Sequence, residues 1–170
     1  MAMHPSMDRI RATLTSATKG MTDREWSQHP EGKWCAAEVV EHLSLTYSGT
    51  AEALRRVLVA DKPAATSLRL KQRVGIFYVI TLGRFPEGRK APKQVVPTGS
   101  QDGANILAQA VDHLAKMDAA LTACENRFGS ETRISNHPVL GALTASQWRK
   151  FHAIHASHHV PQIERLRKTG

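Results

Sequence analysis

Four stretches of this chain carry apolar residues three and four positions apart, the spacing that places side chains on one face of a helix. This pattern predicts helices over about 6–18, 35–60, 104–128 and 144–168. The apolar positions are Met7, Ile10 and Leu14 in the first; Val39, Leu43, Ala53, Leu54 and Val57 in the second; Leu107, Val111, Leu114, Leu121 and Phe128 in the third; and Trp148, Ile163 and Leu166 in the fourth. Four long helices predict an all-α, antiparallel four-helix bundle.

The ends of the fourth helix carry recognisable signals. Thr144 and Gln147 have the spacing of a capping box, in which each side chain bonds the backbone N–H of the other residue. Arg165, Arg167 and Lys168 follow in the last turns, where cations interact favourably with the negative end of the helix dipole.

Two segments lie between the second and third helices. Residues 74–82 are rich in β-branched and aromatic side chains, but the chain offers no partner strand, so we expect a short helix packed on the bundle. Residues 84–103 contain repeated prolines and glycines and predict a long loop. Together they predict a long crossover between helices two and three.

Length and composition indicate one soluble domain over residues 1–170. No apolar run is long enough to span a bilayer, and the N-terminus lacks the pattern of a signal peptide, so we expect a cytoplasmic protein. Cys35 and Cys124 are far apart and form no CxxC pair, which favours two reduced, buried thiols over a disulfide or a zinc ribbon.

The net charge of +8 is concentrated in one part of the chain. Residues 61–100 contain eight Lys or Arg and two Asp or Glu, which gives +6, whereas the predicted helices are nearly balanced. A basic loop region fits a small anionic molecule better than a duplex. The sequence has no zinc-finger spacing, no aromatic RNA-binding signature and no phosphate-binding glycine loop, so we expect no nucleic-acid partner.

Histidines cluster in the fourth predicted helix. His155 and His159 are four residues apart and therefore share a face, and His152 lies within about 60° of them on a helical wheel. His158 lies about 100° from His159 and is expected at the edge or exposed. With His42 from the apolar side of the second helix, this face predicts a three-nitrogen metal site with an open position. The alternative is that the imidazoles hydrogen-bond to one another and to neighbours.

No residue stands out as the general base, so catalytic residues stay unknown. The candidates are Glu38, Glu41, His152 and His158. Glu38 is one turn from His42 and would either orient that ring or stabilise the start of its helix, and we favour the second role. Cys35 shares the face of His42 but lies about 10 Å away along the helix, too far to share a metal.

Three motifs carry a resemblance to a known family. The segments are 34–43 (WCAAEVVEHL), 137–144 (HPVLGALT) and 155–163 (HASHHVPQI). In this order and spacing they resemble the DinB-like, YfiT-related four-helix bundles over nearly the whole chain. The chain departs from the family at Cys35, where serine is usual, and at Pro161, which removes a helix hydrogen bond and is expected to kink the helix past the histidines.

The resemblance implies a divalent metal, zinc or nickel, held by His42, His155 and His159. Some relatives are transferases or isomerases that use a low-molecular-weight thiol. The leading hypothesis is therefore a metal-dependent, thiol-dependent transferase or a metal-assisted hydrolase acting on a small anionic substrate. The rivals are a non-catalytic, stress-associated metal-binding protein and a basic nucleic-acid-binding bundle.

We also expect a homodimer. Ile154 projects away from the histidine face, and residues 74–80 are too apolar to stay fully exposed to water.

Overall fold

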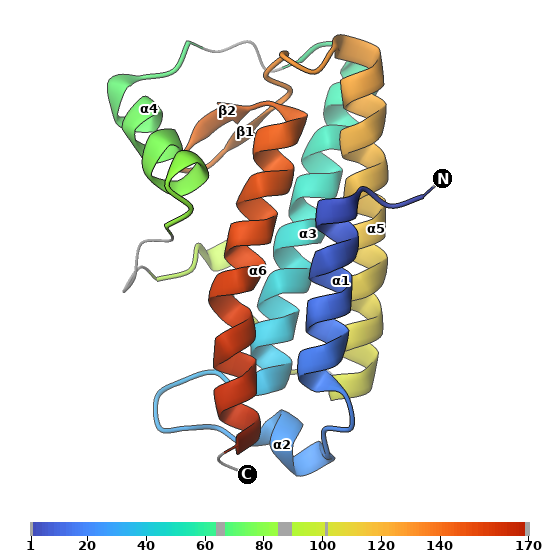
Figure 1. Ribbon diagram of the computed structural model, residues 1–170, viewed down its shortest axis with the longest axis vertical. Coiled ribbons are helices and arrows are strands. Elements are labelled where there is room, and N and C mark those ends of the chain that lie inside the picture. The colour runs from blue at the N-terminus through green and yellow to red at the C-terminus, as the bar shows by residue number, and fades with distance from the viewer. Residues whose placement is uncertain (1, 64–66, 85–89, 101, 169–170) are drawn as a thin grey trace.

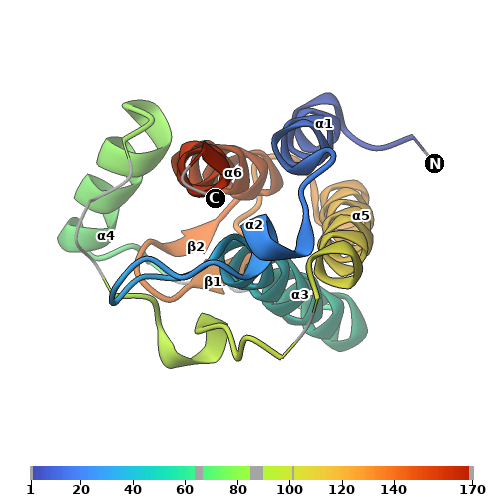
Figure 2. The same ribbon diagram turned by 90° about the horizontal axis from the view of Figure 1, so that it is seen from below.

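Four long helices form the body of the molecule. The computed structural model describes residues 2–63, 67–84, 90–100 and 102–168. The long helices are α1 (Pro5–Thr18), α3 (Ala36–Ala60), α5 (Gly103–Phe128) and α6 (Ala145–Lys168). They lie side by side along the long axis (Figure 1) and surround one hydrophobic core (Figure 2). The predicted helical bundle is confirmed, and so are the four helices, to within one or two residues at each end.

The long crossover sets the direction of the helices. Neighbours along the chain, α1 with α3 and α5 with α6, run antiparallel, whereas α3 and α5 run in the same direction (Figure 1). Asp61 follows the last residue of α3 and forms an ion pair with Arg127 near the end of α5, with Nη2 and Oδ2 2.7 Å apart. A chain that leaves one end of the bundle and returns to the other is required for this arrangement.

The core contains the apolar faces that the sequence predicts for α1 and α6, and for α3 it contains Val39, Leu43 and Leu54, whereas Ala53 and Val57 are half-buried. For α5, Leu114 and Leu121 are buried as predicted, whereas Leu107, Val111 and Phe128 are half-buried. The fully buried residues of that helix are Ile106, Ala110, Leu114, Met117, Leu121 and Cys124. Ala110 and Cys124 are small, which weakens their contribution to a pattern read from apolar residues alone.

The sequence analysis did not predict a short helix and a short β-hairpin. Helix α2 (Asp23–Ser27) begins with a capping box in which Thr22 and Glu25 bond each other's backbone, a signal that the sequence does contain. Strands β1 (Ser135–His137) and β2 (Gly141–Leu143) form an antiparallel hairpin. Each strand has three residues, fewer than an alternating pattern needs to be recognised.

The crossover between α3 and α5 starts with helical structure, as expected. Helix α4 (Leu70–Ile76) continues into the π-helical turn η1 (Phe77–Thr81) and lies beside the hairpin (Figure 1). Val79 and Ile80 are buried against the bundle, and a 3-10 turn, η2 (Lys93–Val95), follows. Residues 64–66, 85–89 and 101 lie outside the described residues, and with them Pro86, Glu87, Gly88 and Arg89 of the predicted loop. No helix among the described residues is long and apolar enough to cross a membrane.

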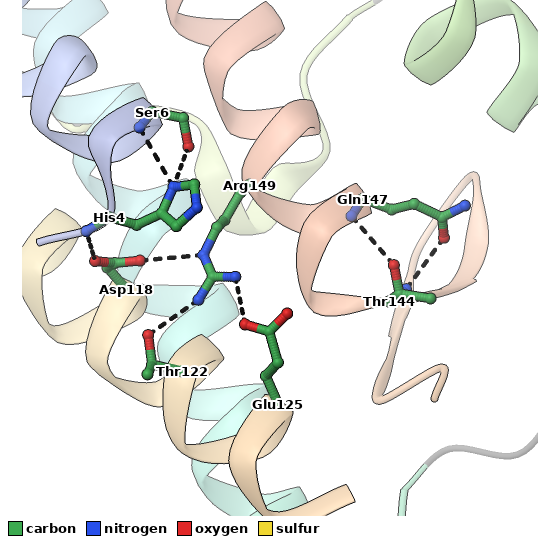
Figure 3. A network of polar contacts seen from close by, with 8 residues as sticks. All are labelled: His4, Ser6, Asp118, Thr122, Glu125, Thr144, Gln147 and Arg149. Carbon is green, nitrogen blue, oxygen red and sulfur yellow. Dashed lines mark hydrogen bonds and ion pairs between the residues drawn. The ribbon is translucent and has the colours of Figure 1, made fainter. Parts of the chain in front are cut away.

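A buried ionic network joins α6 and the start of α1 to α5 (Figure 3). Arg149 is 5% exposed and Asp118 is 4% exposed, and Arg149 Nε lies 3.3 Å from Asp118 Oδ1. The same guanidinium bonds Glu125 Oε2 at 2.7 Å and Thr122 Oγ1 at 2.9 Å. The backbone N–H of His4 donates to Asp118 Oδ2 at 2.7 Å. The buried cation is therefore paired and hydrogen-bonded, which is the condition for burying charge at acceptable cost.

Candidate metal centre

Two helices bring three histidines together in the interior of the bundle. His42 lies in the second turn of α3, and His155 and His159 lie one turn apart on α6. All three are less than a tenth exposed. Their ligand atoms lie within 4.8 Å of one another, and no ion is part of the structure. The three residues that the sequence singles out do converge.

The distances between the nitrogens match those of a metal site. His155 Nε2 lies 3.2 Å from His42 Nε2 and 3.1 Å from His159 Nε2. Ligands about 2.05 Å from a tetrahedral zinc ion lie roughly 3.3 Å apart. These two nitrogen pairs are therefore close to the spacing of ligands on one zinc ion.

The outer nitrogens of two of these rings are held by the protein. His42 Nδ1 lies 2.7 Å from the carbonyl oxygen of Val95, which comes from η2 in the crossover. His159 Nδ1 lies 3.1 Å from Gln162 Oε1, within α6. Both partners are acceptors, so both Nδ1 atoms carry the proton and donate. In the neutral ring this leaves an unprotonated Nε2, the form that binds metal.

Hydrogen bonds among the three rings cannot use the lone pairs of all three Nε2 atoms. The Nε2 atoms of His42 and His159 each present a lone pair to His155 Nε2, which carries at most one proton for two short contacts. A cation accepts all three lone pairs at once. The donor set therefore fits a divalent transition metal, and neutral imidazole suits zinc, copper, iron and nickel.

The surroundings keep the imidazoles neutral and ordered. Burial lowers the pKa of His42, lowers that of His155 well below its ordinary value and lowers that of His159 to about 4. The ring of Phe151 stacks on His155 with centroids 5.6 Å apart, and Trp34 lies 5.1 Å from His42. At neutral pH these ligands need not release a proton to bind a cation.

The other two histidines of the cluster lie outside the three-nitrogen site. His152 is 1% exposed, and its Nε2 lies 3.1 Å from Thr50 Oγ1. Burial lowers the pKa of His152 to about 3. His158 is exposed, as its position on the helical wheel predicts. Among the described residues, the group of converging ligands contains neither of them.

The two candidate carboxylates have structural partners. Burial raises the pKa of Glu41, but hydrogen bonds from Thr98 and Gly99 outweigh it and the pKa is lowered overall. These bonds run from the Thr98 N–H and hydroxyl to Oε1 and from the Gly99 N–H to Oε2. Glu38 accepts the N–H of Cys35, the N-cap residue of α3, and so stabilises the helix start as favoured above. Glu41 holds the crossover beside the histidines, a role that the sequence did not reveal.

Helix α6 continues through Pro161 to Lys168 without interruption. Pro161 itself is exposed, and the ring of His159 faces the core two residues earlier. The departure from the family pattern at this position therefore leaves the ligand pair in place.

An open depression lies on the opposite face of α6. It has a volume of about 840 Å³ and is lined by Tyr78, Arg84, Lys150, Ile154 and His158, among others. None of the three converging histidines lines it. The depression is basic, but it is separate from the metal centre.

Comparison with known proteins places the chain in a family. A profile of the DinB superfamily matches residues 6–163, a range that contains the three histidines and nearly all of the four long helices. The uncharacterized protein YuaE of Bacillus subtilis (strain 168) is 25% identical over 162 residues, which cover 95% of this chain and 94% of that protein. No solved structure matches the chain. On the match over nearly its full length, the chain belongs to the DinB superfamily.

Proposed function

We propose that this chain binds one divalent metal, zinc or nickel, through His42, His155 and His159, and uses it as a thiol-dependent transferase or a hydrolase. The observation that carries the proposal is the convergence of three imidazoles, in which His155 Nε2 lies 3.2 Å from His42 Nε2 and 3.1 Å from His159 Nε2. Three protein ligands leave a coordination position open, which is the arrangement of catalytic rather than structural zinc.

The protein's own groups prepare this site. The Val95 carbonyl and the Gln162 amide fix the tautomers of His42 and His159, so that their Nε2 atoms stay available. Glu41 anchors Thr98 and Gly99 and thereby holds the segment that carries Val95. A metal bound there supplies a Lewis acid that favours the ionised form of a coordinated water or thiol.

The substrate class follows from the charge of the crossover. Lys93 is exposed and lies in the same three-residue turn as Val95, whose carbonyl contacts His42. A small anionic molecule that approaches the metal past this turn meets a cation. This supports a small anionic substrate and gives no support to a nucleic-acid partner.

One observation favours a second candidate, metal binding without turnover. The open depression with a basic lining is on the other face of α6 and is not lined by any of the three histidines. A protein that only holds a metal needs no substrate cavity beside it.

X-ray absorption of the zinc-loaded Cys35→Ser protein separates the possibilities, because this variant removes the cysteine nearest the site. We expect a first shell of nitrogen and oxygen only, and a sulfur neighbour at about 2.3 Å after 2-mercaptoethanol is added. A zinc shell that stays free of sulfur would contradict the thiol-dependent reading. A protein that binds no zinc would overturn the proposal as a whole.

A further inference from the structure

A second group of potential metal ligands lies at the start of α3. His29 comes from the loop after α2, Cys35 is the N-cap residue of α3, and Glu38 lies in its first turn. One ligand atom from each lies within 4.8 Å of the other two. A turn in which the Lys33 N–H donates to the Pro30 carbonyl at 3.0 Å folds His29 back over the helix. The three donors are thus brought together by local folding, independently of the histidines of α6.

The ring of His29 is oriented as a metal ligand would be. Its Nδ1 lies 2.8 Å from the Ser27 carbonyl oxygen, and its Nε2 lies 2.8 Å from Glu38 Oε2. A ring that donates from Nδ1 to a carbonyl leaves an unprotonated Nε2 in its neutral form. That lone pair would then face a carboxylate oxygen, and a nitrogen and an oxygen 2.8 Å apart need either a shared proton or a metal cation beside them. A proton on Nε2, giving a simple ion pair, is the competing explanation.

Cys35 adds the donor that distinguishes this group. The residue is 3% exposed, and burial raises the pKa of its thiol, so the free protein holds it protonated. A buried neutral thiol is a poor nucleophile but becomes a strong ligand once a metal displaces its proton. The other oxygen of Glu38, Oε1, packs against Gly99, where a Cβ would lie only 3.2 Å from it.

We propose that His29, Cys35 and Glu38 form a second divalent-metal site, suited to a cation such as Zn²⁺ that accepts nitrogen, sulfur and oxygen ligands together. Binding replaces the thiol proton of Cys35, which passes to solvent, and water completes the coordination. Cys35 precedes His42 by seven residues of helix, about 10 Å, so the two sites hold separate ions.

Cobalt(II) substitution tests this second site. A cobalt–sulfur absorption band cannot come from the three-histidine site, because that site contains no sulfur. In the His155→Ala protein, which lacks the first site, we expect one equivalent of Co²⁺ to bind with a near-ultraviolet sulfur-to-cobalt band and release of about one proton. Adding Cys35→Ser should abolish the band and reduce Co²⁺ affinity at least tenfold. Serine is a favourable N-cap, so this variant should fold.

Two further variants complete the experiment. Cys124→Ser removes the other thiol, which is buried in the core and bonds Leu54, and should leave the band unchanged. His29→Gln should lower Co²⁺ affinity at least tenfold. The proposal is overturned if the His155→Ala protein binds no Co²⁺, if the band survives Cys35→Ser, or if His29→Gln has no effect, which would identify an ion pair only. None of these outcomes depends on metal binding at the first site.

Discussion

Arg149→Met should be among the most destabilising substitutions in the chain, because it leaves buried charge without its partner. Asp118 is 4% exposed and would keep only the N–H of His4 as a close donor. Glu125, also paired to Arg149, is half-buried. Breaking a buried ion pair by removing one member costs about 3–5 kcal/mol. For a domain of this size this is a fall in Tm of roughly 6–20 °C.

The matched control is Arg127→Met, which breaks an ion pair on the surface. Arg127 and Asp61 are 62% and 57% exposed, and such exposed pairs contribute little to stability because water and salt screen them. Urea unfolding of both variants, with Cm and m fitted separately, measures the difference. Adding Asp118→Asn to Arg149→Met should restore part of the lost stability, since the unpaired charge is removed. Equal stability of the Arg149 and Arg127 variants would refute the reasoning.

Three further predictions concern the metal, the pH dependence and the assembly. Gln162→Leu should weaken zinc binding about 10–100-fold in competition titrations, because His159 loses the acceptor that fixes its tautomer; unchanged affinity would remove Gln162 from the site. Burial lowers the pKa of His137 to about 4, so the unfolded chain takes up this proton first and stability falls as pH drops from about 6.5 to about 4. That fall should be shallower in His137→Gln, as measured by urea unfolding at each pH. Finally, Phe77 is 56% exposed and Val74 60% exposed, which supports a homodimer, and light scattering should give twice the monomer mass rather than a single chain.

The sequence was sufficient to predict the four long helices and the three histidines that come together between two of them. Helical spacing placed Trp148, His152 and Ile163 on the buried face of α6, where the structure has them. The same spacing selected His155 and His159, since residues one turn apart must lie together on a helix. Local periodicity is the strongest signal that a single sequence carries, and His155 and His159 are brought together by it.

The contacts that orient the ligands could not be predicted. Val95 contacts His42 through its backbone, and a carbonyl has no residue signature. Glu41 binds Thr98 and Gly99 across more than fifty residues, so its partners depend on the path of the crossover. Contacts between residues so far apart in the chain produce no periodic pattern of apolar and polar residues.

The charged residues in the core could not be predicted for a different reason. The helical wheel places Arg149 about 60° from His152, on the buried side of α6. A cation is nevertheless expected outside unless its partners are known. Those partners, Asp118 and Glu125, lie on α5 and become visible only when the two helices are docked (Figure 3).

Metal content of matched variants tests the central claim most directly. In the Cys35→Ser background, which removes the proposed second site, elemental analysis after zinc loading and desalting should give one zinc ion per chain. Adding His155→Ala should reduce this to none, because two imidazoles hold a divalent ion poorly. Adding His158→Ala should leave one, since that side chain is exposed and lies outside the converging group. Equal zinc content in the His155→Ala and His158→Ala proteins would contradict the account.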